Sequence, residues 1–161
     1  MTTAVDFKDA LASWASGVSV VATRAGGLAY GLTVSSFTSL SLDPPLVLVC
    51  VASRNRLPAM IRDVGRFAIS LLSADQGAAS SHFARAGREP SPSFGVAEER
   101  TAAGLPVVAG AAAHLACDLH DQLVVGDHTI IVGRVTEAIA RPDREPLLYH
   151  RRRYRTLGAA V

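Results

Sequence analysis

The stretch TVSSFTSLSLDPPLVLVCVA, residues 33–52, decides the fold. Its second part, LVLVCVA at 46–52, is an unbroken apolar run that predicts a buried strand, since it is too short to cross a membrane as a helix. Its first part, 33–45, is rich in Ser and Thr and contains no Lys or Arg. Asp43-Pro44-Pro45 stiffens the junction, because proline fixes φ and restricts the residue before it. The stretch therefore predicts a hydroxyl-rich edge strand that leads into a core strand.

Strand-like segments continue on both sides of this stretch. Runs rich in β-branched residues predict further strands at 17–23, 28–36, 66–72, 111–119, 128–140 and 146–149. Ala25-Gly26-Gly27 is a hairpin-type break between the first two, and HDQLVVGD joins 111–119 to 128–140. Because strands outnumber helices and most turns are short, the sequence predicts a mainly β fold with inserted α: an antiparallel barrel with flanking helices, not a doubly wound sheet.

Three helices are predicted: one between the cap Asp6 and Gly17, one over 55–64 with Asn55 as its N-cap, and one from Asp75 to about Arg85. The first has an apolar stripe at i, i+3, i+4 and i+7 spacing, which is typical of an amphipathic helix. Residues 86–110 hold Gly, Pro and Ser in excess and predict irregular structure, with Phe94 as an anchor.

Length and composition limit the class of protein. A chain of 161 residues predicts a single domain over 1–161, and 49% hydrophobic against 19% charged residues excludes disorder as the main state. A formal net charge of +2 is too small to imply nucleic acid or a membrane surface as the main partner. Cys50 and Cys117 lie in apolar sequence and are expected to be reduced thiols. With no signal-peptide pattern and no long apolar segment, we expect a cytoplasmic protein.

Several familiar kinds of site are disfavoured. His114, Cys117 and His120 have a tempting spacing, but a strand points the histidines to one face and the cysteine to the other, which predicts no metal site, a core cysteine and histidines at the rim. A serine hydrolase lacks its G-x-S-x-G elbow, and dinucleotide binding on a Rossmann unit lacks G-x-G-x-x-G. The basic run HRRRYR, 150–155, is more typical of a solvated cluster than of a nucleic-acid surface.

The hydroxyl stretch is a candidate binding wall. Thr33, Ser35 and Ser36 leave a strand where the chain must bend, so they can present both hydroxyls and backbone N–H groups to a ligand. Residues 52–55, just after the core strand, add Arg54 and a helix N-terminus, which favours anions. These features indicate a phosphorylated ligand, and a hydroxyl-rich edge strand followed by a capped helix explains them equally well.

Four ordered segments resemble one known family. GLTVSSFTSLSLDPPLVLVCV (31–51), HFA (82–84), GDHTIIVGRV (126–135) and PLLYHRRRYRTL (146–157) resemble the flavin reductase-like family, and the likeness runs through nearly the whole chain. The resemblance implies an FMN-binding split β-barrel, a homodimer, FMN or FAD as cofactor, and NADH or NADPH as co-substrate. It also implies the role of reductase component that supplies reduced flavin to a separate flavin-dependent monooxygenase.

The resemblance also implies which residues bind. By matching motifs, the cofactor-binding residues are Thr33, Val34, Ser35 and Ser36 along the ribityl chain and phosphate; Cys50, Val51 and Ala52 at the isoalloxazine edge; Ser53, Arg54 and Asn55 near the phosphate; Phe83, Ala84 and Arg85 from the third helix; His128 at the nicotinamide; and Tyr154 at the border of the site. Many members carry Ser or Thr where this chain has Asn55-Arg56-Leu57, which leaves the preference for FMN or FAD open and gives Arg54 or Arg56 a compensating role.

The implied mechanism is hydride transfer from nicotinamide to flavin N5. The two rings must stack within about 3–3.5 Å, and no side chain need act as acid or base. His128 would position the nicotinamide, and the reduced flavin would then diffuse to the oxygenase. Two alternatives stay open: a split-barrel electron-transfer protein with tightly held FMN and little turnover of free flavin, and a non-flavin interaction domain that uses the HRRRYR tail.

Overall fold

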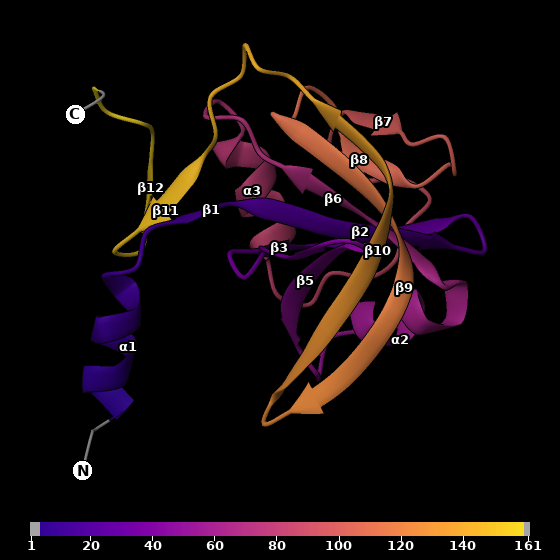
Figure 1. Cartoon of the computed structure of the whole chain (residues 1–161), viewed down its shortest axis with the longest axis horizontal. Coiled ribbons are helices and arrows are strands. Elements are labelled where there is room, and N and C mark those ends of the chain that lie inside the picture. The colour runs from indigo at the N-terminus through magenta and orange to yellow at the C-terminus, as the bar shows by residue number, and fades with distance from the viewer. Residues whose placement is uncertain (1–3, 160–161) are drawn as a thin grey trace.

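The computed structural model describes residues 4–159, which fold around one curved antiparallel sheet (Figure 1). The elements follow in the order α1 (Ala4–Ala12), β1 (Ser16–Gly17), β2 (Ser19–Ala25), β3 (Leu28–Val34), β4 (Thr38–Leu42), β5 (Pro45–Ala52), α2 (Leu57–Val64), β6 (Arg66–Leu71), α3 (Gly77–Ala84), β7 (Glu98–Arg100), β8 (Pro106–Val108), β9 (Ala113–Val125), β10 (His128–Ala140), β11 (Leu148–His150) and β12 (Arg153–Arg155). Strands dominate, so the predicted mainly β fold with inserted helices is confirmed.

The main sheet has seven strands in the order β3-β2-β6-β9-β10-β5-β4. β5 pairs with β10 so that Val51 lies opposite Thr129 and Val49 opposite Ile131, and β4 pairs with the other side of β5. β4 is therefore an edge strand beside a core strand, as the 33–52 stretch predicted. Because β4 pairs antiparallel with β5, the chain that leaves β3 lies beside the end of β5, where Ser36 contacts Cys50, and these ends carry the candidate site.

The core lies on the inner face of this sheet. Val47, Val49 and Val51 alternate along β5 with less buried neighbours, and they pack with Phe67 and Ile131 in one cluster. Burying each such side chain contributes about 1.5–3 kcal/mol. Gly133 lets β10 approach this cluster, because a Cβ there would lie 2.8 Å from the Cβ of Cys117 and would overlap the ring of Phe67. A buried core thus fixes the curvature that shapes the site.

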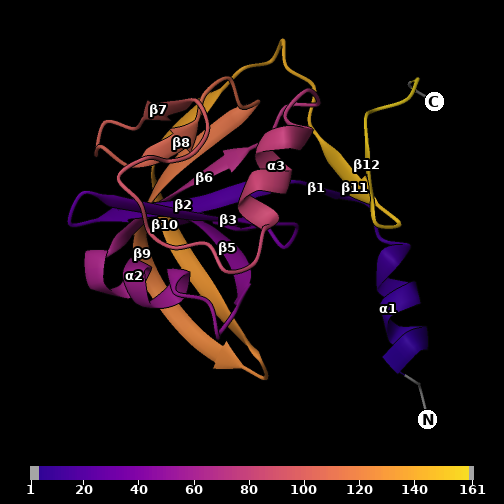
Figure 2. The same ribbon diagram turned by 180° about the vertical axis from the view of Figure 1, so that it is seen from behind.

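The helices differ in how they contact the sheet. α2 packs against β2 and β6, and α3 packs against β3 and β2. α1 and the small sheet β1-β11-β12 stand to one side of the barrel, as both views show (Figures 1 and 2). Apolar side chains of this part are consequently uncovered: Phe7 and Leu11 of α1 are 59% and 56% exposed, and Trp14, two residues beyond the end of α1, is 76% exposed.

The predicted helix boundaries were wrong in their caps. α1 begins at Ala4 and ends at Ala12, so Asp6 lies inside the first turn and Gly17 belongs to β1. α2 begins at Leu57 after Arg56, whose side chain makes no capping hydrogen bond, so Asn55 is not the cap. α3 begins at Gly77, two residues after Asp75. A polar residue near a helix start is a candidate cap, but the turn that precedes the helix decides which residue occupies the cap position.

Three strand predictions were also wrong. HDQLVVGD is mostly strand, because β9 continues to Val125 and the connection to β10 is only the turn at Gly126-Asp127, where Gly126 has a φ of 60°. The segment 86–110, expected to be irregular, contains the β7–β8 hairpin, although Phe94 is buried in it as predicted. The basic run contains β12, which pairs with β11 around Arg151 and Arg152, both with positive φ.

Candidate functional site

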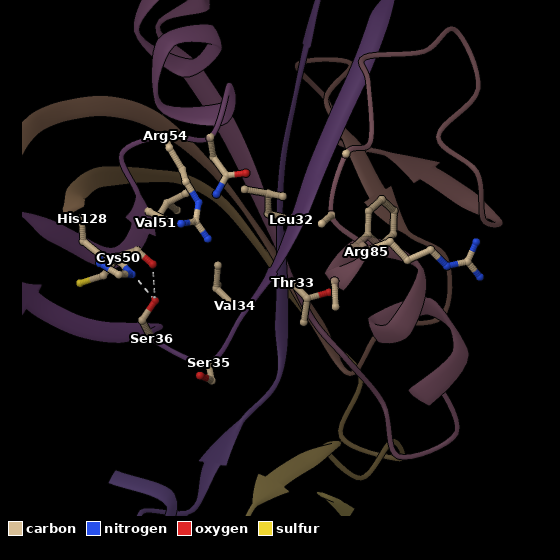
Figure 3. A pocket seen from close by; sticks show the side chains of 16 residues that line it. Leu32, Thr33, Val34, Ser35, Ser36, Cys50, Val51, Arg54, Arg85 and His128 are labelled. Atoms are coloured by element: carbon tan, nitrogen blue, oxygen red, sulfur yellow. Dashed lines mark hydrogen bonds between the residues drawn. The ribbon is translucent and has the colours of Figure 1, made fainter. Parts of the chain in front are cut away.

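A cavity of about 610 Å³ opens beside the ends of β3 and β5 (Figure 3). Four segments line it: Leu32, Thr33, Val34, Ser35 and Ser36; Cys50, Val51, Ala52, Arg54 and Asn55; Phe83, Ala84, Arg85, Ala86 and Gly87; and His128. Ligand pockets typically measure about 300–1,000 Å³, so this cavity can hold most of a cofactor-sized molecule.

Two hydroxyls hold the walls of the cavity together. The Ser36 hydroxyl donates to the carbonyl of Cys50 and accepts from the N–H of the same residue, both at 2.9 Å (Figure 3). The Thr33 hydroxyl donates to the carbonyl of Ser80 in α3 at 2.7 Å. Ser35 lies between them with an exposed side chain and no hydrogen-bond partner among residues 4–159. Of the three hydroxyls, that of Ser35 is the one free to serve a ligand.

The base of the cavity is apolar. Val51 is 3% exposed and Val34 is 9% exposed, and both belong to the core cluster, while Leu32 packs against that cluster. Cys50 is a free, partly exposed thiol on the opposite face of β5 from Val51. An apolar base with polar groups at the rim suits a flat aromatic ring that carries a polar chain.

Positive charge reaches the cavity from one side. The exposed Arg54 side chain points into the space beside Val51 and Val34, whereas Arg85 points away from it (Figure 3). Arg54 follows the turn in which the N–H of Asn55 donates to the carbonyl of Ala52 at 2.9 Å. A guanidinium in this position can pair with a phosphate group of a ligand.

His128 stands at the rim with a carboxylate behind its ring. Nδ1 of His128 lies 2.7 Å from Oδ1 of Asp127. The hydrogen bond from His128 lowers the pKa of the Asp127 carboxyl, and the charges of His128 and then Arg54 lower it further. With Nδ1–H donated to this carboxylate, Nε2 is left to face a ligand. The His128–Asp127 pair thus places a hydrogen-bonded imidazole ring at the rim of the cavity.

α3 is fixed by aromatic contacts behind the cavity. The Phe83 ring is fully buried, 4.7 Å from the Phe94 ring by centroids, and the Arg88 guanidinium carbon lies 4.7 Å over it. Arg88 also donates to the carbonyl of Gly31 in β3 at 2.8 Å. Because its ring is occupied in this way, Phe83 offers the cavity mainly its backbone and positions the segment Ala84–Gly87.

Comparison with protein-family models shows which family this chain belongs to. The model described as "Flavin reductase like domain" matches residues 11–158. The chain belongs to the flavin reductase-like family. The predicted resemblance is therefore confirmed over nearly the whole chain.

Named relatives agree with this assignment. The reductase component of 4-hydroxyphenylacetate 3-monooxygenase from Thermus thermophilus is 45% identical over 94% of this chain and 95% of its own length. The NADH-dependent flavin reductase of a Rhodococcus species is 39% identical over 96% and 87%. Among solved structures, the NADH:FAD oxidoreductase of Streptomyces globisporus has a TM-score of 0.89 at 35% identity, covering 96% of this chain and 93% of that one. The predicted split-barrel fold is confirmed by such similarity.

Most of the residues assigned by resemblance line one cavity of this flavin reductase-like domain, and two do not. The hydroxyl of Ser53 lies 2.9 Å from that of Thr129, within the strand end. Tyr154 lies in a smaller pocket next to the cavity. Leu32, Ala86 and Gly87 line the cavity although the motifs did not single them out. The sequence feature that could have identified these three residues is that each is adjacent or close in sequence to a motif residue.

Three other sequence expectations concern residues outside the cavity. His114 is 3% exposed and faces Glu137 at 3.5 Å, so its expected place at the rim was wrong, whereas His120 is exposed. Within residues 4–159 no group of His, Cys, Asp and Glu is arranged to hold a metal ion. Cys117 is a buried free thiol whose pKa is raised to about 12, chiefly by burial. Over the same range, no helix has the length and hydropathy needed to cross a membrane.

Proposed function

We propose that this protein is an NADH-dependent flavin reductase whose cavity between β3, β5, α3 and His128 holds the flavin. The single observation that carries the proposal is that three of the four family motif segments meet around one cavity with an apolar base, a free hydroxyl and one inward arginine. Relatives that are 39% and 38% identical to this chain are named NADH-dependent flavin reductase and NADH-dependent FAD reductase, which supports NADH as the reductant.

The residues present fit a flavin. The apolar base formed by Leu32, Val34 and Val51 suits the isoalloxazine ring, and Ser35 with the neighbouring backbone suits the ribityl chain. Arg54 is placed to meet the phosphate. No acidic side chain is among the lining residues, so nothing there opposes an anionic ligand.

A bound flavin supplies the hydride-accepting chemistry, and the chain's own residues bind, orient and exclude water. Val34 and Val51 keep water from the base of the cavity, because both side chains are buried. Arg54 neutralises phosphate charge at the rim. His128 presents Nε2 to the carboxamide of the nicotinamide, and Asp127 fixes the orientation of the imidazole ring through Nδ1. Asp127 is a carboxylate at neutral pH in any case, and the hydrogen bond from His128, which lowers its pKa, shifts its protonation further into the acid range.

The reduced flavin is proposed to serve a separate oxygenase. Relatives named as the reductase component of 4-hydroxyphenylacetate 3-monooxygenase and the reductase subunit of a flavin-dependent monooxygenase support this role. A reductase that releases its flavin needs only modest affinity, which agrees with one inward arginine and hydroxyls largely committed to the protein itself.

Steady-state kinetics test the proposal. Purified protein is assayed with NADH or NADPH against FMN, FAD and riboflavin, and NADH oxidation is expected to depend on added flavin and to saturate with it. NADH is expected to have the higher kcat/KM. Stoichiometric, slowly dissociating FMN with negligible turnover would instead establish the electron-transfer alternative. Absence of flavin-dependent oxidation with either nucleotide would refute the reductase function.

We propose that the protein forms a homodimer through α1. Phe7 and Leu11 of α1 are exposed, and Trp14, two residues beyond the helix, is 76% exposed beside a groove of about 690 Å³ that Phe37 and Leu71 also line. An exposed apolar stripe next to an apolar groove is typical of a surface that a second copy covers.

Sedimentation equilibrium tests the dimer. The wild-type protein is expected to sediment as a dimer, and Trp14→Glu is expected to shift it toward monomer at the same concentration. Ala59→Glu, at an exposed position of α2 outside this surface, serves as the matched control because it also adds one negative charge. A monomeric wild-type protein would contradict the proposal.

A further inference from the structure

Arg56, the second arginine after β5, is held in an ion pair outside the lining of the cavity. Its Nη2 lies 3.0 Å from each carboxylate oxygen of Glu89. Both side chains are more exposed than buried, and neither residue lines the cavity itself. An ion pair as exposed as this contributes little to stability. Its location, rather than its strength, therefore decides what it does.

The pair joins two of the segments that line the cavity. Arg56 directly follows the lining residue Asn55. Glu89 lies two residues beyond Gly87, which lines the cavity from the segment after α3. Arg54, two residues before Arg56, points into the cavity (Figure 3). The end of the cavity that is proposed to hold the phosphate thus has one arginine directed inward and a second one bound to a carboxylate.

The backbone is fixed on both sides of the pair. The N–H of Asn55 closes a turn onto the carbonyl of Ala52 at 2.9 Å. Arg88, the neighbour of Glu89, donates to the carbonyl of Gly31 in β3 at 2.8 Å. The two side chains of the ion pair can consequently separate by rotation alone, without movement of the walls of the cavity.

We infer that Glu89 sets how tightly the flavin phosphate is held, because it withholds Arg56 from that phosphate. This role rests on the proposed flavin reductase function, which places the phosphate at Arg54. The Glu89 carboxylate accepts from the guanidinium that a phosphate would otherwise bind, and its negative charge opposes a phosphate at the same end of the cavity. Glu89 is thus a specificity-determining residue that keeps the affinity for phosphorylated flavins low enough for release.

Substitutions of the two partners should have opposite effects. Glu89→Gln frees Arg56 and removes a negative charge, so it is expected to lower the dissociation constant for FMN about fivefold, the scale of one exposed charge pair. Arg56→Gln leaves the Glu89 carboxylate unpaired and is expected to raise that constant about threefold. Riboflavin has no phosphate, so its dissociation constant should stay within about twofold of wild type in both variants. A pair that only held the cavity walls together would instead make both substitutions weaken FMN and riboflavin alike.

Fluorescence titration of FMN and of riboflavin tests the inference on wild-type protein, both single variants and the double variant. In the double variant the tightening caused by Glu89→Gln should be lost, because no Arg56 is left to be freed. Asp118→Asn is the matched control, since it removes one negative charge from an exposed ion pair with Arg66 that does not line the cavity. It should leave the ratio of the FMN and riboflavin constants within about twofold of wild type. A ratio in Glu89→Gln equal to that of wild type, or tightening of the same size without Arg56, would overturn the inference.

Failure of the proposed function gives a different result. If FMN binds but NADH does not reduce it, the reductase function fails and the titrations still decide the role of Glu89. If wild-type protein binds neither flavin, inorganic phosphate is titrated while the Nε–H resonance of Arg56 is followed by NMR. This resonance should respond at lower phosphate concentration in Glu89→Gln than in wild type, and an identical response in the two proteins would overturn the inference.

Discussion

Replacing Ser36 with Ala should loosen the wall of the cavity more than it weakens any direct contact with a ligand. The Ser36 hydroxyl makes two hydrogen bonds of 2.9 Å to the backbone of Cys50, one as donor and one as acceptor. Ser36→Ala leaves the Cys50 N–H and carbonyl without these partners. The neighbouring Ser35 differs by one position and makes no such bonds among the described residues.

The magnitude follows from the two lost bonds. A buried polar group left unpaired costs about 1–3 kcal/mol, and both groups here are only partly buried, so water recovers part of the loss. We expect Ser36→Ala to lower the free energy of unfolding by about 2 kcal/mol. For a domain of this size that corresponds to a fall in Tm of about 4–8 °C.

Urea unfolding and flavin titration of both variants test this expectation. Ser35→Ala should change the free energy of unfolding by less than about 0.5 kcal/mol, because its hydroxyl is exposed. It should nevertheless raise the dissociation constant for flavin about fivefold, the value of one hydrogen bond. Equal stability losses in the two variants, or a Ser36→Ala protein as stable as wild type, would refute the reasoning.

Three further predictions concern the rim of the cavity. Arg54→Ala should raise the FMN dissociation constant about tenfold and leave that of riboflavin unchanged, since riboflavin lacks the phosphate; an equal rise for both would remove Arg54 from the phosphate site. Asp127→Ala should raise the KM for NADH while the FMN dissociation constant stays constant. Asp127→Asn should raise this KM less, because the amide oxygen still accepts a hydrogen bond from His128. A KM unaffected in both variants would count against orientation of His128 by Asp127. Alkylation near pH 8 should label the partly exposed Cys50 and spare buried Cys117, whose pKa of about 12 leaves about one thiolate in ten thousand. Mass spectrometry that finds Cys117 labelled first would be the contrary result.

The sequence carried the fold class because its strongest signals are local. The apolar run 46–52 and the turn before it became β5 and its junction with edge strand β4. Local patterns do not show how far a polar segment continues as strand. HDQLVV is strand because it pairs with β10, and Gln122 helps by donating to the carbonyl of Pro58 in α2 at 2.9 Å. That contact joins residues far apart in sequence.

The sequence predicted which segments line the candidate site, but not which side chains are free to contact a ligand and which bind the protein itself. Resemblance named Thr33, Ser36 and Phe83 as ligand contacts, and all three line the cavity. The structure gives their functional groups internal partners: the two hydroxyls bind backbone, and the Phe83 ring packs in the core. Such partners depend on register between strands and on helix placement, which residue spacing does not encode.

The start of α2 is another feature that residue type and spacing do not determine. Asn55 has the right residue type for an N-cap, yet its N–H closes a turn onto the carbonyl of Ala52 and the helix begins after Arg56. The two-residue offset moves the helix start away from Arg54, so the guanidinium, not a helix N-terminus, supplies the positive charge that enters the cavity. The positive charge that enters the cavity from this turn therefore comes from one side chain, which a single substitution can remove.

The most direct test of the account is anaerobic reduction of FMN by NADH with wild-type protein and with Ser35→Trp, which places a large ring at an exposed position of the cavity lining. The account predicts rapid bleaching of the flavin absorbance with wild-type protein and loss of that rate with Ser35→Trp, because Ser35 lines the cavity that holds the flavin. Reduction that proceeds at the same rate with folded Ser35→Trp protein would contradict the placement of the reaction in this cavity.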